Sequence, residues 1–119
     1  MEEEKRFYLK PRPDIHVGGL TISRKEGKGI VIVNFGRLFV AEIATYQVKF
    51  GFQKFKETRL ELSTYLEPID YNLTHEFDEA CFLAVKRTYP NEVAIVLRAP
   101  WSVQFEMDEI YPGFQNFFK

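Results

Sequence analysis

Apolar and polar residues alternate along much of this chain, and that spacing limits the fold more than any other feature of the sequence. Successive side chains of a β-strand point to opposite faces, so alternation predicts a strand with one face in the core. The pattern occurs over residues 20–24, 44–53, 60–66, 92–98 and 101–107, whereas the continuous apolar run at 30–33 predicts a strand buried on both faces. We expect residues 53–57 to connect two of these strands.

One segment, residues 74–87, instead has the spacing of an amphipathic helix. Thr74 can cap its first turn, and Lys86 and Arg87 suit the negative end of the helix dipole. The apolar stripe of this helix would consist of Phe77, Ala80, Cys81, Ala84 and Val85. The predicted fold class is therefore α+β but mostly β: a curved antiparallel sheet or partly open small barrel of about six strands, with one main helix near 74–87.

A chain of 119 residues corresponds to one domain. We expect residues 1–107 to form it and residues 108–119 to be an acidic and then aromatic tail. The single cysteine, Cys81, cannot form an internal disulfide, which predicts a reducing, intracellular setting. No apolar run reaches the length of a membrane span, so we expect no membrane partner, and no motif indicates a cofactor.

Charge is distributed unevenly along the chain. Residues 5–59 contain twelve Lys or Arg residues and four carboxylates, whereas residues 60–119 contain four basic and ten acidic residues. The basic half also contains many Phe and Tyr residues. Cations that neutralise phosphates and rings that stack on bases are the two components of single-strand binding, so the pattern predicts a small, non-catalytic protein that binds single-stranded nucleic acid.

The predicted nucleic-acid-binding residues combine basic and aromatic side chains from this half. They are Arg37, Lys49, Phe50, Phe52, Lys54, Phe55, Lys56 and Arg59. An alternative is that Tyr46, Val48, Phe50 and Phe52 face the core, in which case the opposite parity (Thr45, Gln47, Lys49, Gly51 and Gln53) forms a polar outer face.

The sharpest enzymatic pattern is a proline-aspartate, Pro13-Asp14, followed by Glu26-Gly27-Lys28, the arrangement of some metal-dependent nucleases. The triplet falls between Lys25 and Gly29, where glycines predict a hairpin turn, so we predict no catalytic and no metal-binding residues, with a metal-dependent nuclease as a distant alternative function. His75 is expected to be an exposed residue at the start of the helix, with a general-base role as the alternative. Cys81 is expected to be a small buried apolar residue.

The tail supports a second function hypothesis. Tyr111, Phe114, Phe117 and Phe118 recur at about one-turn spacing and could dock on a partner or fold back over the domain's own core. The alternative function is accordingly a protein-interaction module or a homodimer that uses exposed sheet edges and this tail.

Overall fold

A computed structural model of the chain describes residues 9–16, 18–33, 35–56, 59–60, 64–78, 80–100 and 102–107. For Phe55, Lys56, Arg59, Leu60, Asp78 and Tyr89 it describes the backbone alone. Strands account for 63% of this described part, which contains no helix. The predicted tail at 108–119, with Tyr111, Phe114, Phe117 and Phe118, lies outside the described residues.

Two antiparallel sheets make up the fold. Sheet A has five strands in the spatial order β1 (Lys10–Pro11), β9 (His75–Asp78), β10 (Cys81–Tyr89), β11 (Glu92–Arg98) and β2 (Leu20–Lys25). Every neighbouring pair in this sheet is antiparallel. The longest ladder joins β10 to β11, two strands that follow each other in sequence through a short turn.

Sheet B is built around one long strand. Its order is β12 (Phe105–Met107), β3 (Gly29–Ile32), β4 (Gly36–Ile43), β5 (Gln47–Lys56) and β6 (Arg59–Leu60), while β7 (Thr64–Tyr65) and β8 (Ile69–Asp70) also pair with β5. One edge of β5 therefore pairs with β4, and the other edge is shared by three two-residue strands.

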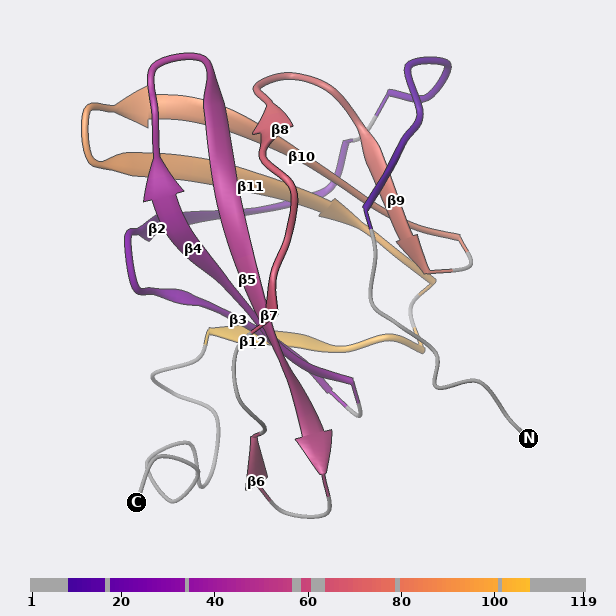
Figure 1. The fold of residues 1–119 in the computed structure, drawn as a ribbon. Coiled ribbons are helices and arrows are strands. Elements are labelled where there is room, and N and C mark those ends of the chain that lie inside the picture. Colours follow the sequence, from indigo (N-terminus) through magenta and orange to yellow (C-terminus); the bar gives the residue numbers. More distant parts are fainter. Residues whose placement is uncertain are drawn as a thin grey trace.

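The two sheets pack face to face without closing into a barrel, as Figure 1 shows. The turn between β2 and β3 passes the chain from sheet A to sheet B. Apolar side chains from both sheets fill the space between them: Ile30, Ile32, Leu38, Val40, Val48, Phe50, Phe52, Ile69, Phe77, Cys81, Leu83, Val85, Val93, Ile95 and Leu97. Burial of this set is the main source of stability for such a fold.

The strand predictions for the central part of the chain are largely confirmed. All four residues of β3 are buried, as expected for an apolar strand covered on both faces. The alternating segment 44–53 forms a strand, but β5 begins at Gln47 and continues to Lys56, so the connection expected at 53–57 is mostly strand. Tyr46 lies in the preceding turn and is 82% exposed, because alternation of faces applies only within the strand itself.

The helix predicted at 74–87 is wrong. These residues form β9 and β10, an antiparallel pair joined at Ala80, whose φ of 58° is left-handed. Cys81, Leu83 and Val85 are all buried toward the core, which is a period of two. The predicted apolar stripe of the helix did not include Leu83, whereas the observed strand buries Leu83 completely. Tertiary burial therefore outweighs the charge pattern that favoured a helix.

Another predicted strand, 101–107, is shorter than expected, because its described strand covers Phe105–Met107 alone. In the segment 60–66, Leu60 of β6 and Thr64–Tyr65 of β7 are in strands, and residues 61–63 lie outside the described residues. Within the described ranges, no stretch forms a helix with the length and apolar character needed to span a bilayer.

Candidate functional site

The two faces of β5 carry different kinds of side chain. Val48, Phe50 and Phe52 point into the core, and Phe50 is completely buried. Gln47, Lys49, Gly51 and Gln53 occupy the opposite, outer parity. Phe50 and Phe52 are therefore not accessible for stacking on bases, and the alternative in which they belong to the core describes them correctly.

A row of residues crosses four strands on the outer side of sheet B. Strand register aligns Gly29 of β3 with Phe39 of β4, Phe39 with Gly51 of β5, and Gly51 with Tyr65 of β7. The Phe39 ring lies over Gly51, where a Cβ atom would overlap it. It meets the Tyr65 ring edge-on, with centroids 6.2 Å apart and an interplanar angle of 78°, the geometry aromatic pairs prefer.

Cations flank both rings of this row. The Arg37 guanidinium carbon lies 4.8 Å from the centroid of the Phe39 ring, and the Lys49 Nζ lies 5.4 Å from that of Tyr65. Both distances fall within cation–π range. We define Arg37, Phe39, Lys49, Gly51, Gln53 and Tyr65 as the outer aromatic face.

Arg37 is a buried member of this face and is largely shielded from solvent. Its side chain is buried and donates hydrogen bonds from Nη1 to Gln53 Oε1 (2.9 Å) and from Nη2 to the Gly27 carbonyl oxygen (2.6 Å). The prediction that Arg37 contacts a phosphate directly does not fit this geometry. Its guanidinium instead places positive charge over the Phe39 ring, and its hydrogen bonds hold the guanidinium in position.

Tyr65 and Lys49 are the accessible members of the face. Tyr65 is 60% exposed, and Lys49 is partly exposed and forms no ion pair within the described ranges. Two carboxylates lie close in register: Glu42 is opposite Lys49, and Asp70 Oδ1 accepts a hydrogen bond from Gln47 Nε2 (2.9 Å). The face can therefore stack one planar group and neutralise one nearby anion, and its acidic border limits its affinity for anions.

Of the remaining predicted binding residues, Lys54 is not part of this face. Lys54 is exposed on β5 but has the parity of Phe52, opposite Gly36 of β4. The side chains of Phe55, Lys56 and Arg59 lie outside the described residues. Sequence reasoning missed Tyr65, although its parity opposite to Leu60 and Leu66 marked it as the aromatic on the polar side of its segment.

The residues of the nuclease-like pattern do not converge. Asp14 follows β1, at one edge of sheet A, and Glu26 follows β2, at the other edge. Gly27, with φ of 83°, forms the β2–β3 turn, and Glu26 Oε1 accepts a hydrogen bond from the Ile43 backbone N–H (2.9 Å). Among the described residues, no group of three His, Cys, Asp or Glu side chains could hold a metal ion.

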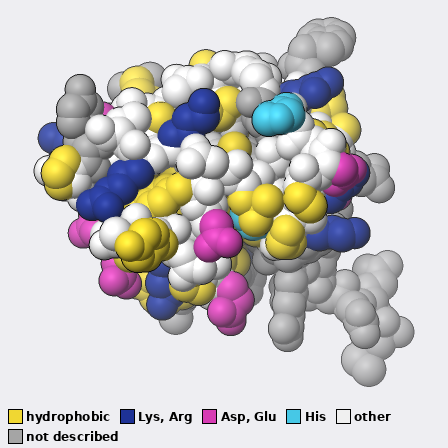
Figure 2. All heavy atoms as spheres, turned by 90° about the horizontal axis from the view of Figure 1, so that it is seen from above, with side chains coloured by type: hydrophobic (Ala, Val, Ile, Leu, Met, Phe, Trp, Pro, Cys, Tyr) yellow, Lys and Arg dark blue, Asp and Glu magenta, His cyan; other side chains and the backbone are white. Residues whose placement is uncertain are grey.

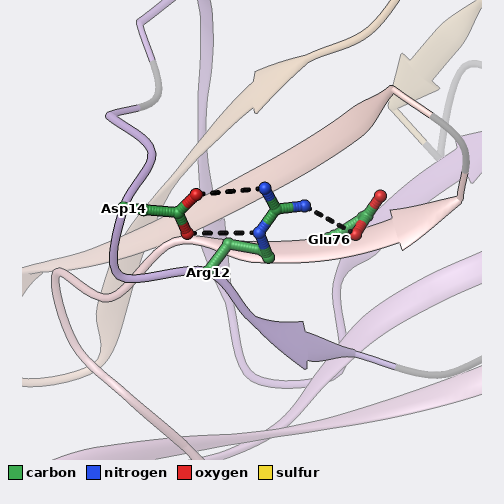
Figure 3. A network of polar contacts seen from close by, with 3 residues as sticks. All are labelled: Arg12, Asp14 and Glu76. Carbon is green, nitrogen blue, oxygen red and sulfur yellow. Dashed lines mark hydrogen bonds and ion pairs between the residues drawn. The ribbon is translucent and has the colours of Figure 1, made fainter.

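Asp14 has another partner, as Figure 3 shows. Arg12 donates from Nε and Nη2 to the two carboxylate oxygens of Asp14 (3.2 and 3.1 Å) and from Nη1 to Glu76 Oε1 (3.0 Å). These hydrogen bonds lower the pKa of Asp14 from its usual value. The network ties the loop after β1 to β9, which is a structural role.

His75 is buried, not exposed as expected. It is 3% exposed on β9, and its Nδ1 lies 3.1 Å from the Leu73 carbonyl oxygen, which accepts the hydrogen bond. Burial lowers the pKa of His75, against the opposing effects of that carbonyl and of Asp70. Cys81 is buried in the core, as predicted.

Comparison with known proteins finds no match to this chain among protein-family models, curated proteins or solved structures. The outer aromatic face is the described surface that brings an exposed ring, a second supporting ring and two cations together. Its chemistry suits a ligand with a flat aromatic part and a negative charge.

Proposed function

We propose that this chain binds single-stranded nucleic acid on its outer aromatic face and does so without catalysis. One observation carries the proposal: the Tyr65 ring is 60% exposed, and it is braced by the edge of Phe39 and accompanied by the ammonium group of Lys49. A braced, solvent-facing ring is a stacking platform for a base, because every base offers a π-face.

Lys49 would supply the electrostatic part of binding. Its Nζ is 5.4 Å from the Tyr65 ring centroid, so a base stacked on that ring brings its phosphate within reach of the lysine. Neutralising a phosphate releases condensed counterions, which makes affinity fall as salt rises. With Lys49 as the accessible cation and Glu42 beside it, we expect modest affinity and a shallow salt dependence.

The proposal is tested by fluorescence anisotropy with labelled single-stranded DNA, single-stranded RNA and duplex DNA at several salt concentrations. We expect single strands to bind more tightly than duplex, since paired bases do not offer their faces to a ring. Absence of detectable single-strand binding at low salt would overturn the proposal.

Variants of Tyr65 and Lys49 distinguish the contribution of base stacking to affinity from the contribution of charge. Tyr65→Ala should weaken binding by about 1–3 kcal/mol, whereas Tyr65→Phe keeps the ring and should bind nearly as well as the wild type. Lys49→Ala should reduce the salt slope by about 1. The matched control is Lys86→Ala, which removes an exposed lysine from β10 of sheet A and should leave both quantities unchanged.

A second candidate function, self-association, is favoured by the exposed edge of sheet A. Among the described strands, β2 pairs with β11 alone, and its first residue, Leu20, is 51% exposed. A six-residue edge strand can pair with the same strand of another chain. A solution mass of one chain at high protein concentration would exclude this candidate, and Thr21→Pro, which removes a backbone donor from that strand, should abolish any dimer observed.

A further inference from the structure

A second exposed ring lies immediately before β5, the strand with which the β7 strand of Tyr65 pairs. Tyr46 lies in the turn between β4 and β5 and is 82% exposed. The proposed function makes no use of it. An aromatic side chain so fully in solvent contributes little to the core, so its chemistry is open to a ligand.

The backbone that carries Tyr46 is anchored on several sides. The Ala44 N–H donates to the Gln47 carbonyl oxygen (2.9 Å) and closes the turn. Tyr71 Oη donates to the Ala44 carbonyl oxygen (2.6 Å), and Arg87 Nη1 donates to that of Thr45 (3.4 Å). Because the turn is already held from β10 and from the segment after β8, binding at Tyr46 would cost little ordering of the backbone.

Strand geometry sets the separation of the two rings. Tyr65 is opposite Gly51 in register, and Gly51 is five residues after Tyr46. At about 3.3 Å per residue, the two attachment points are on the order of 17 Å apart along β5. Lys49 lies between them on the outer parity, and Arg87 lies beneath the Tyr46 turn.

Lys49 and Arg87 supply positive charge along this path, and the carboxylates Glu42 and Asp70 border it opposite Lys49 and Gln47. Besides the Thr45 carbonyl oxygen, Arg87 donates to the Pro90 carbonyl oxygen (3.5 Å), and within the described ranges it forms no ion pair with a carboxylate. Figure 2 looks onto the end of the molecule that carries the β4–β5 turn and shows Lys and Arg side chains interspersed with Asp, Glu, uncharged and apolar ones. A phosphate backbone is the polyanion that such spaced cations and rings suit.

We propose that the binding path runs along β5 from Tyr65 to Tyr46, so that the ligand is a single strand several nucleotides long with a base stacked at each end and its backbone passing Lys49. This inference rests on the proposed function and extends it from one base to a defined length of strand. It predicts that affinity rises sharply once a strand is long enough to reach both rings.

The test is a length series of labelled oligothymidylates, from about two to about twelve nucleotides, with wild type, Tyr46→Ala, Tyr65→Ala and the double variant. For the longest strands, Tyr46→Ala should weaken binding by about five- to one-hundred-fold. For dinucleotides it should have no effect, whereas Tyr65→Ala should weaken binding at every length. Tyr46→Phe is the matched control and should keep the length dependence.

The possible outcomes separate the two proposals. If the wild type binds and Tyr65→Ala weakens it, but Tyr46→Ala equals the wild type at all lengths, the extended path is wrong and the proposed function stands. If the wild type binds no strand of any length, both proposals are wrong. Urea unfolding of each variant verifies folding, and since Tyr46 is in solvent we expect its removal to leave stability unchanged within about 0.5 kcal/mol.

Discussion

The two faces of β5 place aromatic rings in opposite environments. On the inner face, Phe50 is fully buried between the sheets; on the outer face, Phe39 and Tyr65 lie across Gly51 from neighbouring strands. The inner ring belongs to β5, whereas the outer rings are brought to it by strand pairing. Phe50 and Phe52 of β5 therefore maintain the fold, and aromatics from other strands form the surface that we propose binds a ligand.

This contrast distinguishes side chains that contribute to stability from side chains that we propose contribute to binding. A buried ring contributes through the apolar area removed from water, and removing it leaves a cavity. On the outer face, Tyr65 keeps much of its surface in water, so its removal costs little stability but removes a contact site, whereas Phe39 is buried. Variants of the two faces should thus affect different measurements.

The largest effect is expected on the inner face. Phe50→Ala should lower the free energy of unfolding by about 3–5 kcal/mol, because a large, fully buried ring is lost. Urea denaturation measures this, with Lys49→Ala, the adjacent outer-face residue, as a control expected within about 0.5 kcal/mol of wild type. Equal stabilities for the two variants would contradict the assignment of faces.

Gly51→Ala should affect both measurements. The added methyl group meets the Phe39 ring and must displace it, at a cost of about 1–3 kcal/mol in stability. It should also weaken single-strand binding, since Phe39 braces Tyr65. The matched control is Gly18→Ala, because a Cβ at Gly18 meets no atom within 4 Å. Wild-type binding by a folded Gly51→Ala protein would show that Tyr65 acts without its brace.

The inner region also contains a titratable group, which predicts a pH dependence. Burial lowers the pKa of His75 in the folded protein, so the unfolded chain binds a proton more readily. The contribution of neutral His75 to the free energy of unfolding is therefore complete above about pH 6.5. This contribution decreases as pH falls from there toward the pKa of His75 in the folded protein.

Denaturation at a series of pH values checks this dependence. His75→Gln should flatten the profile in that window, whereas His16→Gln, at an exposed position in the loop after β1, should leave the profile unchanged. A wild-type stability that rises on acidification below about pH 6.5 would refute the prediction.

The smallest effect is expected at the acidic border of the outer face. Glu42→Gln removes a carboxylate opposite Lys49 and should strengthen single-strand binding by about two- to five-fold at low salt. Glu92→Gln, on β11 of sheet A, is the control and should have no effect. If both changes strengthen binding equally, net charge rather than the position of Glu42 determines the affinity.

The local apolar pattern correctly predicted β3, from a continuous apolar run, and most of β5, from alternation, because the residues that face the core there follow from neighbours in sequence. It failed at β9 and β10, where Thr74, Lys86 and Arg87 matched helix ends. The turn at Ala80 uses a left-handed conformation that glycine or asparagine usually adopts, so no turn signal was present.

The candidate site was predictable only in part. Lys49 and the polar parity of β5 followed from the sequence. The place of Phe39 over Gly51 depends on how β4 aligns with β5, and that of Tyr65 depends on the pairing of β7 with β5. Such long-range register is set by the packing of the whole sheet, which one sequence does not specify locally.

β5 pairs more extensively with β4 than with β7, so we expect β7, which carries Tyr65, to open separately from β4. β4 pairs with β5 from Gly36 to Ile43, whereas β7 is attached by the pairs Gly51–Tyr65 and Phe52–Thr64 and by the Leu66 N–H bond to the Phe50 carbonyl oxygen. Because the described residues of β7 form few pairs, we expect this attachment to open at a smaller part of the global unfolding free energy than the β4–β5 ladder. A single-stranded nucleic acid stacked on Tyr65 would stabilise the paired state of β7. Its binding would therefore slow amide hydrogen exchange in β7 and leave exchange in β4 unchanged.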